Sequence, residues 1–189
     1  ASELTGLIRE LDPTTSKQRK TTTCNGGTGS DWNIPQNWSG TYGGSVTDYG
    51  RDILDQRLVG EYGQYRVLGK HEEGDMHERQ NTGGDVSEEL FCYCLETKVR
   101  EIEKQKDLVS GHFQWIFNAH ANPGRETLYC LDGSGSNAIG VVNSKGLLTS
   151  WGEPVDAWYM YRSHYVSCQK EPMVYLVSHT WPDRFKDGP

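Results

Sequence analysis

The chain has 189 residues, with 26 acidic against 19 basic side chains, a net charge of −7 and a pI near 5.4. This acidic balance argues against a nucleic-acid-binding protein and against binding to anionic membranes. Mean hydropathy is −0.72 and no apolar run approaches the roughly 18 residues of a membrane span, so we expect no membrane-spanning segment. The chain is long enough to bury a hydrophobic core.

Segment 2–11 has apolar residues at the i, i+3, i+4, i+7 spacing of an amphipathic helix, and Asp12-Pro13 is expected to end it. Residues 21–24 predict a short strand followed by a turn. The loop up to residue 44 is long and contains three large aromatic rings, and loops of this length in compact domains are usually functional.

The next elements are a short connecting helix over 46–56 and a strand over 57–60. This strand delivers Glu61 in a turn, GEYG at 60–63, at the carboxyl end of the strand. In a parallel α/β architecture that end carries the chemistry, which favours a functional role for Glu61. The alternative is a solvated or helix-capping acid.

The strongest helix signal follows residue 84. Asp85 is the expected cap, Glu88 completes a capping box, and an apolar stripe continues to Ile102. A strand over 107–118 comes next, then a helix from Pro154 to about residue 165 and a strand over 172–178. Successive strand and helix segments, with long loops after the strands, predict an α/β fold.

The six tryptophans and 22 glycines suit a loop-built pocket lined by flat rings, as in proteins that hold the apolar faces of sugars. For any single tryptophan, a place in the core is the alternative. We expect the scattered cysteines to be mostly buried thiols, because they lack the C-x-x-C spacing of zinc or redox sites: Cys24, Cys92, Cys94, Cys130 and Cys168. The acids and histidines at 71–77 match no standard metal site, so we predict a solvated loop and no metal or cofactor.

Five stretches, in this order along the chain, carry a family resemblance: LDPT at 11–14, GEYG at 60–63, GHFQWIF at 111–117, GVVNSKGLLT at 140–149 and PVDAWYMY at 154–161. They resemble the catalytic barrel of family 2 glycoside hydrolases, which includes β-galactosidases, β-glucuronidases and β-mannosidases. The resemblance covers nearly the whole chain. It implies part of a (β/α)8 TIM barrel, about strands 6 to 8, over residues 1–168, and a linker with the first strand of a following β-sandwich domain over 169–189.

The implied activity is that of a retaining exo-β-glycosidase, with β-galactosidase as the preferred specificity and the β-glucuronidase type as an alternative. Glu61 matches the family's nucleophile and Trp115 its aromatic wall. Asn37 matches an asparagine that approaches the nucleophile, whereas Ser39 stands where a tyrosine is common and Tyr42 is the candidate replacement. The expected substrate-binding residues are Asn37, Trp38, Tyr42, Tyr62, His112 and Trp115. A histidine on a strand is, however, more often structural.

The family's second carboxylate, the acid/base, follows an asparagine, and this chain contains no Asn-Glu pair. The resemblance therefore implies a fragment that is inactive alone and that joins the rest of its own catalytic domain, with a β-linked carbohydrate as substrate. Basic residues do not cluster near the predicted strand ends, so this part of the sequence gives no indication of a carboxylate-bearing sugar. A non-catalytic carbohydrate-binding module and an interaction fragment are the other functional classes. The sequence leaves the compartment open and is compatible with a homo-oligomer.

Overall fold

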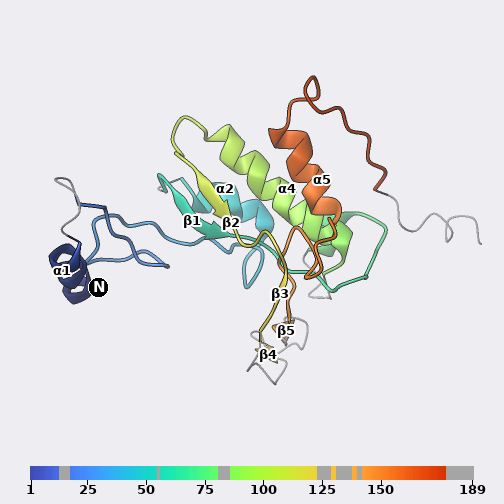
Figure 1. Ribbon diagram of the computed structural model, residues 1–189. Coiled ribbons are helices and arrows are strands. Elements are labelled where there is room, and N and C mark those ends of the chain that lie inside the picture. Colours follow the sequence, from blue (N-terminus) through green and yellow to red (C-terminus); the bar gives the residue numbers. More distant parts are fainter. Residues whose placement is uncertain are drawn as a thin grey trace, which may run out of the picture.

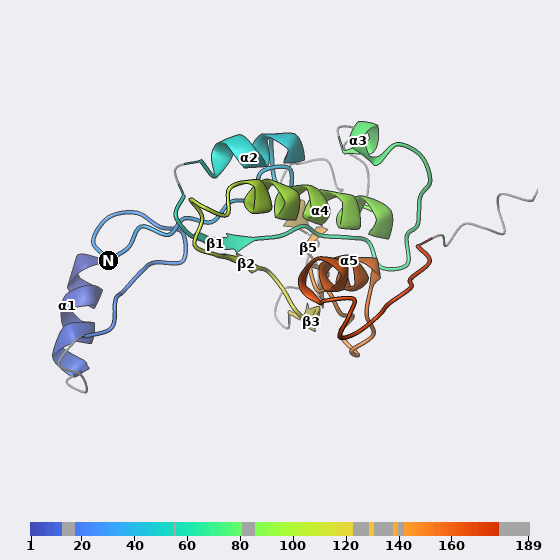
Figure 2. The same ribbon diagram turned by 90° about the horizontal axis from the view of Figure 1, so that it is seen from above.

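The computed structural model describes residues 1–12, 18–54, 56–80, 86–122, 129–130, 138–139 and 142–177. Figure 1 shows helices α4 and α5 side by side, and Figure 2 shows α4 lying over the β1–β2 pair. The helical elements are α1 (Ser2–Leu11), the 3-10 turn η1 (Val46–Asp48), α2 (Tyr49–Asp52), α3 (Met76–Arg79), α4 (Glu88–Lys104) and α5 (Asp156–Tyr165). The strands are β1 (Val59–Tyr62), β2 (His112–Gln114), β3 (His120–Ala121), β4 (Tyr129–Cys130), β5 (Ala138–Ile139) and β6 (Val142–Asn143).

Strands β1 and β2 are parallel neighbours, and α4 connects them in the sequence. A third extended segment runs parallel to β1 on its other side, because the Asn37 amide donates to the Glu61 carbonyl (2.8 Å) and the Gly60 amide donates to the Pro35 carbonyl (3.0 Å). The three segments thus lie in the order 35–37, β1, β2. This mixed architecture with parallel strands confirms the α/β prediction. The short pairs β3–β6 and β4–β5 are antiparallel.

Helix α4 supplies more of the buried hydrophobic core than any other described element. Its buried stripe runs from Leu90 and Phe91 through Leu95 to Val99 and Ile102, at the helical spacing that the sequence predicts. Leu90, Phe91, Leu95 and Ile102 of this stripe belong to the same core cluster as residues of η1, of α2 and its C-cap, of β1 and of α5, which are Val46, Tyr49, Ile53, Val59, Tyr62, Ala157 and Met160. Burial of this stripe places α4 against the sheet.

The expected cap of α4 was wrong. The N-cap is Ser87, whose hydroxyl accepts from the Leu90 amide (3.2 Å), and the helix begins at Glu88. Glu88 therefore cannot complete a capping box from the third helical position. Its carboxylate instead pairs with the buried Arg66 (3.6 Å). Asp85 lies outside the described residues.

Replacing Ser87 by Ala is expected to lower the free energy of unfolding by about 1 kcal/mol, because the Leu90 amide loses its side-chain acceptor inside the core. Urea unfolding followed by circular dichroism measures the change. Ser110→Ala, in an exposed loop position, is the control. An equal loss in both variants would rule out a specific capping contribution.

Three other element predictions need correction. Glu61 lies within β1 and not in a turn after a strand, and the predicted strand over 107–118 is ordered as a strand only at His112–Gln114. Residues 105–108 form turns after the end of α4, and the Leu108 and Val109 amides donate to the Gln105 carbonyl. Residues 172–177 of the predicted strand over 172–178 form no strand, and Val174 is 92% exposed. The following β-sandwich domain stays a prediction.

Two smaller predictions also differ. Pro154 precedes α5 but does not start it, because Val155 is the N-cap and Asp156 the first helical residue. Cys24 and Cys168 are exposed, contrary to the expectation of buried thiols, whereas Cys94 is buried. The side chain of Cys130 lies outside the described residues.

Helix α1 forms as predicted, but its apolar stripe is exposed, as Leu11 at 71% illustrates. The helix stands apart from the α4–α5 layer in Figure 1 and is attached through a few polar contacts. The Thr5 hydroxyl donates to the Gly29 carbonyl (2.9 Å), and Arg9 pairs with Asp31. Among the helices that the structure describes, none has the length and apolar character to cross a membrane.

Candidate active site

Glu61 lies on the face of β1 that turns away from the helices. The pairing register of β1 with β2 shifts between Val59 and Tyr62, and both of these side chains are fully buried in the core. An extra residue in a strand changes which side chains share a face, as in a β-bulge. Glu61 is therefore directed to the opposite side from Tyr62 and is only half-buried.

The neighbouring segment 37–42 brings two aromatic rings to this side. Asn37 is buried beside Glu61, and its side-chain oxygen accepts from the amide (3.1 Å) and the hydroxyl (2.9 Å) of Ser39. The rings of Trp38 and Tyr42 lie with their centroids 5.3 Å apart. Segment 37–42 is thus folded so that an amide and two flat rings lie next to the strand that carries Glu61.

Gly63 packs between the Trp38 ring and the Trp115 carbonyl, which directly follows β2. A Cβ atom at Gly63 would stand 2.4 Å from the Trp115 carbonyl oxygen and 3.0 Å from the Trp38 ring. Only a residue without a side chain leaves room for both. Trp115 is partly exposed and meets His120 edge-on at 6.5 Å between centroids. The structure therefore brings together Glu61, Asn37, Trp38, Tyr42 and Trp115.

Lys145 is the residue of this group that the sequence analysis missed. It is only 4% exposed, and its Nζ lies 5.5 Å from the Tyr42 ring centroid and 5.9 Å from that of Trp38. Burial raises the pKa of the Glu61 carboxyl, and the Lys145 ammonium lowers it. One enclosed ammonium group beside Glu61 can therefore influence its charge without a cluster of basic residues.

The loop that carries Lys145 is held by specific contacts. The Lys145 amide donates to the side-chain oxygen of Asn143 (3.1 Å), and Arg66 donates to the carbonyls of Ser144 (3.0 Å) and Gly146 (2.6 Å). A Cβ atom at Gly146 would lie 2.0 Å from the Ala119 amide nitrogen. No local sequence signal marks Lys145, because its enclosure depends on Arg66 and on rings from distant segments.

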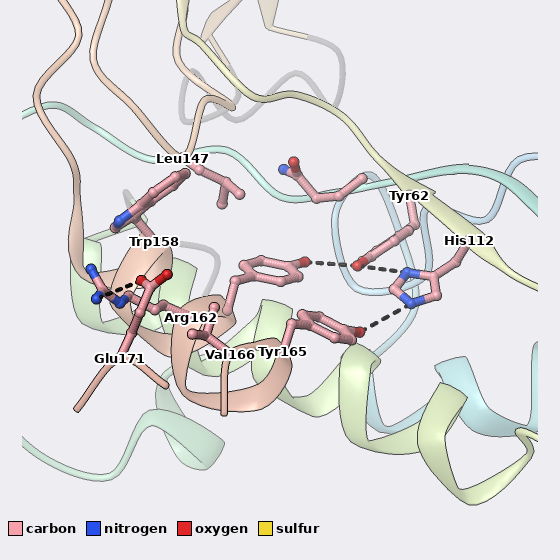
Figure 3. A pocket seen from close by; sticks show the side chains of 10 residues that line it. Tyr62, His112, Leu147, Trp158, Arg162, Tyr165, Val166 and Glu171 are labelled. Atoms are coloured by element: carbon pink, nitrogen blue, oxygen red, sulfur yellow. Dashed lines mark hydrogen bonds and ion pairs between the residues drawn. The ribbon is translucent and has the colours of Figure 1, made fainter. Parts of the chain in front are cut away.

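Tyr62 and His112, both expected to bind substrate, lie on the helix side of the sheet and do not join the Glu61 group. The Tyr62 hydroxyl bonds to the Tyr161 hydroxyl (2.7 Å) and to Nδ1 of His112 (3.0 Å), and Nε2 of His112 bonds to Tyr165 (3.1 Å). Figure 3 shows this network in a cavity of about 360 Å³ between β2 and α5. Burial lowers the pKa of His112. The register shift in β1 explains this placement of Tyr62.

Among the described residues, one group has ligand atoms close enough to hold a metal ion, within 4.8 Å of one another: His71, Glu89 and Asp156. Nδ1 of His71 already bonds to the Glu89 carboxylate (2.8 Å). The two acids lie in the first turns of α4 and α5, where carboxylates favourably oppose the helix dipoles. The absence of a metal and of a cofactor stays a prediction.

No family model matches the chain. A relative from Formosa agariphila, named "Putative beta-glucuronidase", is 31% identical over an alignment of 211 residues that covers 97% of this chain and 24% of the relative. The crystal structure of Parabacteroides merdae β-glucuronidase matches 95% of this chain and 24% of that protein, with a TM-score of 0.68 and 22% identity. A GH2 β-galacturonidase from Eisenbergiella tayi, bound to galacturonate, matches 70% of this chain and 23% of its own, with a TM-score of 0.52 and 17% identity.

Over most of its length the chain is similar to β-glucuronidases and to a GH2 β-galacturonidase. These similarities confirm the resemblance to family 2 glycoside hydrolases carried by GEYG, GHFQWIF and GVVNSKGLLT. The chain spans about a quarter of the length of these relatives, 23% to 24% of each.

Proposed function

We propose that this chain forms the nucleophile side of the active site of a retaining β-glycosidase that acts on uronic-acid glycosides, of the β-glucuronidase type. The observation that carries the proposal is Lys145, a sequestered cation beside Trp38, Tyr42 and Glu61. A sugar that places a carboxylate near this ammonium gains a charge-assisted contact that a neutral galactoside lacks. The names of the relatives from Formosa agariphila and Eisenbergiella tayi agree with a uronide substrate.

The proposed frame is a (β/α)8 barrel. Segment 35–37, β1 and β2 would be strands 6 to 8 within a barrel portion at 1–168, and residues 169–189 would lead to the next domain. The parallel order of the three segments supports this assignment. Enzymes with this architecture carry their catalytic groups at the carboxyl ends of the strands, which is where Glu61, Asn37 and Trp115 lie.

In this mechanism the Glu61 carboxylate attacks the anomeric carbon and forms a glycosyl-enzyme ester. A second carboxylic acid, roughly 5 to 5.5 Å from the first, protonates the leaving oxygen and then activates the water that cleaves the ester. We assign this acid/base to the remainder of the catalytic domain. Trp115 and Trp38 would stack on the sugar and exclude water. Lys145 would also keep Glu61 ionised, since a nearby cation favours the charged form.

Replacing Lys145 by Gln tests the substrate class in the full-length protein. The kcat/KM for 4-nitrophenyl β-glucuronide is expected to fall about 10- to 100-fold, because the sugar carboxylate loses a charged donor. The kcat/KM for the matching β-galactoside is expected to change much less. Lys106→Gln, at an exposed position, is the control.

Equal losses on both substrates, or an unsubstituted enzyme that prefers the galactoside, would contradict the uronide assignment. The second outcome would return the preferred specificity to the β-galactosidase that the sequence suggested. Absence of hydrolysis with glucuronide, galacturonide and galactoside alike would contradict the proposed activity as a whole.

A further inference from the structure

Lys98 is a buried amine on the core side of α4. The residue is fully buried, and its Nζ donates to the Gly63 carbonyl (2.7 Å) and to the Thr41 hydroxyl (2.9 Å). The same nitrogen lies 5.5 Å from the ring centroid of Tyr49. Burial lowers the pKa of Lys98 to about 7. A cation this buried is costly, so stability alone does not explain why a lysine stands at this position.

The two acceptors of Lys98 belong to the two segments that carry the site. Thr41 lies between Trp38 and Tyr42, and its amide donates to the Trp38 carbonyl (2.9 Å). Its hydroxyl donates to the Gly63 carbonyl (2.8 Å) while it accepts from Lys98. Lys98, Thr41 and Gly63 therefore form a closed triangle that links segment 37–42 to the end of β1.

Gly63 is the contact point of the aromatic walls. Its backbone touches the Trp38 ring and the Trp115 carbonyl so closely that a methyl group does not fit. It also follows Glu61 by two residues. A movement of Gly63 would therefore change the spacing of Trp38, Trp115 and Glu61 together.

We propose that Lys98 is a positioning residue of the site, which ties segment 37–42 to Gly63 from the helix side and so sets the spacing of Glu61, Trp38 and Trp115. The effect on turnover rests on the proposed function, whereas the tie itself does not. Because the Thr41 hydroxyl also donates to Gly63, removal of Lys98 leaves that carbonyl with a partner. Without Lys98, the spacing of Glu61, Trp38 and Trp115 is no longer held from the helix side, and the core no longer contains a buried amine.

The test is Lys98→Met in the full-length protein, since methionine has a similar length and no donor. We expect kcat/KM for the aryl β-glucuronide to fall about 10- to 100-fold, with the larger share in kcat, because small displacements of reacting groups are costly. We expect Tm to stay the same or rise. Hydrogen exchange should become faster in peptides covering 36–44 and 61–66, but not in α5.

Lys104→Met is the matched control, because Lys104 lies on the same helix but is exposed, with Glu101 as its partner (2.5 Å). Thr41→Val should reproduce part of the loss, and the double variant should lose less than the two single effects combined, as members of one network do. Unchanged exchange in both peptides would overturn the tie. A loss of activity with a matching fall in Tm would overturn the positioning role and indicate general unfolding.

The two proposals fail in different ways. If the unsubstituted enzyme hydrolyses no aryl β-glycoside, the proposed function fails. Hydrogen exchange of Lys98→Met still tests the link between segment 37–42 and Gly63. Faster exchange in both peptides supports this link, and unchanged exchange overturns it. If the unsubstituted enzyme is active and Lys98→Met keeps its full kcat, the proposed function stands and the positioning role is wrong.

Discussion

Replacing Glu61 by Gln is expected to lower kcat for an aryl β-glycoside by at least about 10³-fold in the full-length protein, because the variant lacks the attacking carboxylate. Because the substitution keeps the size of the side chain, substrate binding is expected to weaken much less than turnover. The charge that faces Lys145 is lost in the variant. Steady-state kinetics on glucuronide and galactoside substrates measure both quantities.

A covalent trap identifies the nucleophile directly. A 2-deoxy-2-fluoro-β-glycoside accumulates the glycosyl-enzyme in a retaining enzyme, and mass spectrometry of the digest is expected to place the label on Glu61. Glu78→Gln, at an exposed position of α3, is the control and should label normally. A label on a different carboxylate would reassign the nucleophile.

A non-catalytic sugar-binding module would be the better account under two conditions. Glu61→Gln would bind sugar normally, and the unsubstituted protein would give no adduct with galactosyl, glucosyl or glucuronyl traps.

Replacing Arg66 by Met is expected to lower the free energy of unfolding by about 3 to 5 kcal/mol, the cost of breaking a buried ion pair from one side. Arg66 is 2% exposed, and it holds the carbonyls of Ser144 and Gly146 while its Nε lies 3.6 Å from Glu88. Burial lowers the pKa of Arg66, and Glu88 opposes this. The variant leaves Glu88 without this partner charge and frees the loop that carries Lys145.

Urea unfolding measures the loss. Arg100→Met is the control, since Arg100 is an exposed residue of α4 paired with Glu96 (2.6 Å) and such pairs contribute at most about 0.5 kcal/mol. The double variant Arg66→Met with Glu88→Gln should recover part of the loss, because it removes the uncompensated charge. A loss below that of Arg100→Met would show that Arg66 does not hold this loop.

Local rules made much of the fold predictable. Helices α1, α4 and α5 follow from apolar spacing, which acts over a few residues and needs no knowledge of the partner surface. The α/β class follows from the order of strand and helix signals. The grouping of Glu61 with Asn37, Trp38 and Trp115 followed from the family resemblance, and the structure brings these residues together, although Glu61 lies within β1 and not in the predicted turn. Their catalytic and binding roles remain predictions.

The remaining features depend on contacts between segments that are distant in the sequence. Tyr62 and His112 face the helices because the register of β1 shifts, and no local pattern reports how a strand pairs with its neighbour. Lys98 and Lys145 have ordinary sequence surroundings, and only tertiary packing encloses both lysines and brings them to acceptors or rings from other segments. The sequence by itself determined helices α1, α4 and α5, the α/β class and the resemblance to family 2 glycoside hydrolases. The tertiary structure decided which side chains share the Glu61 face, because burial and electrostatic environment are properties of the packed chain and not of any single segment.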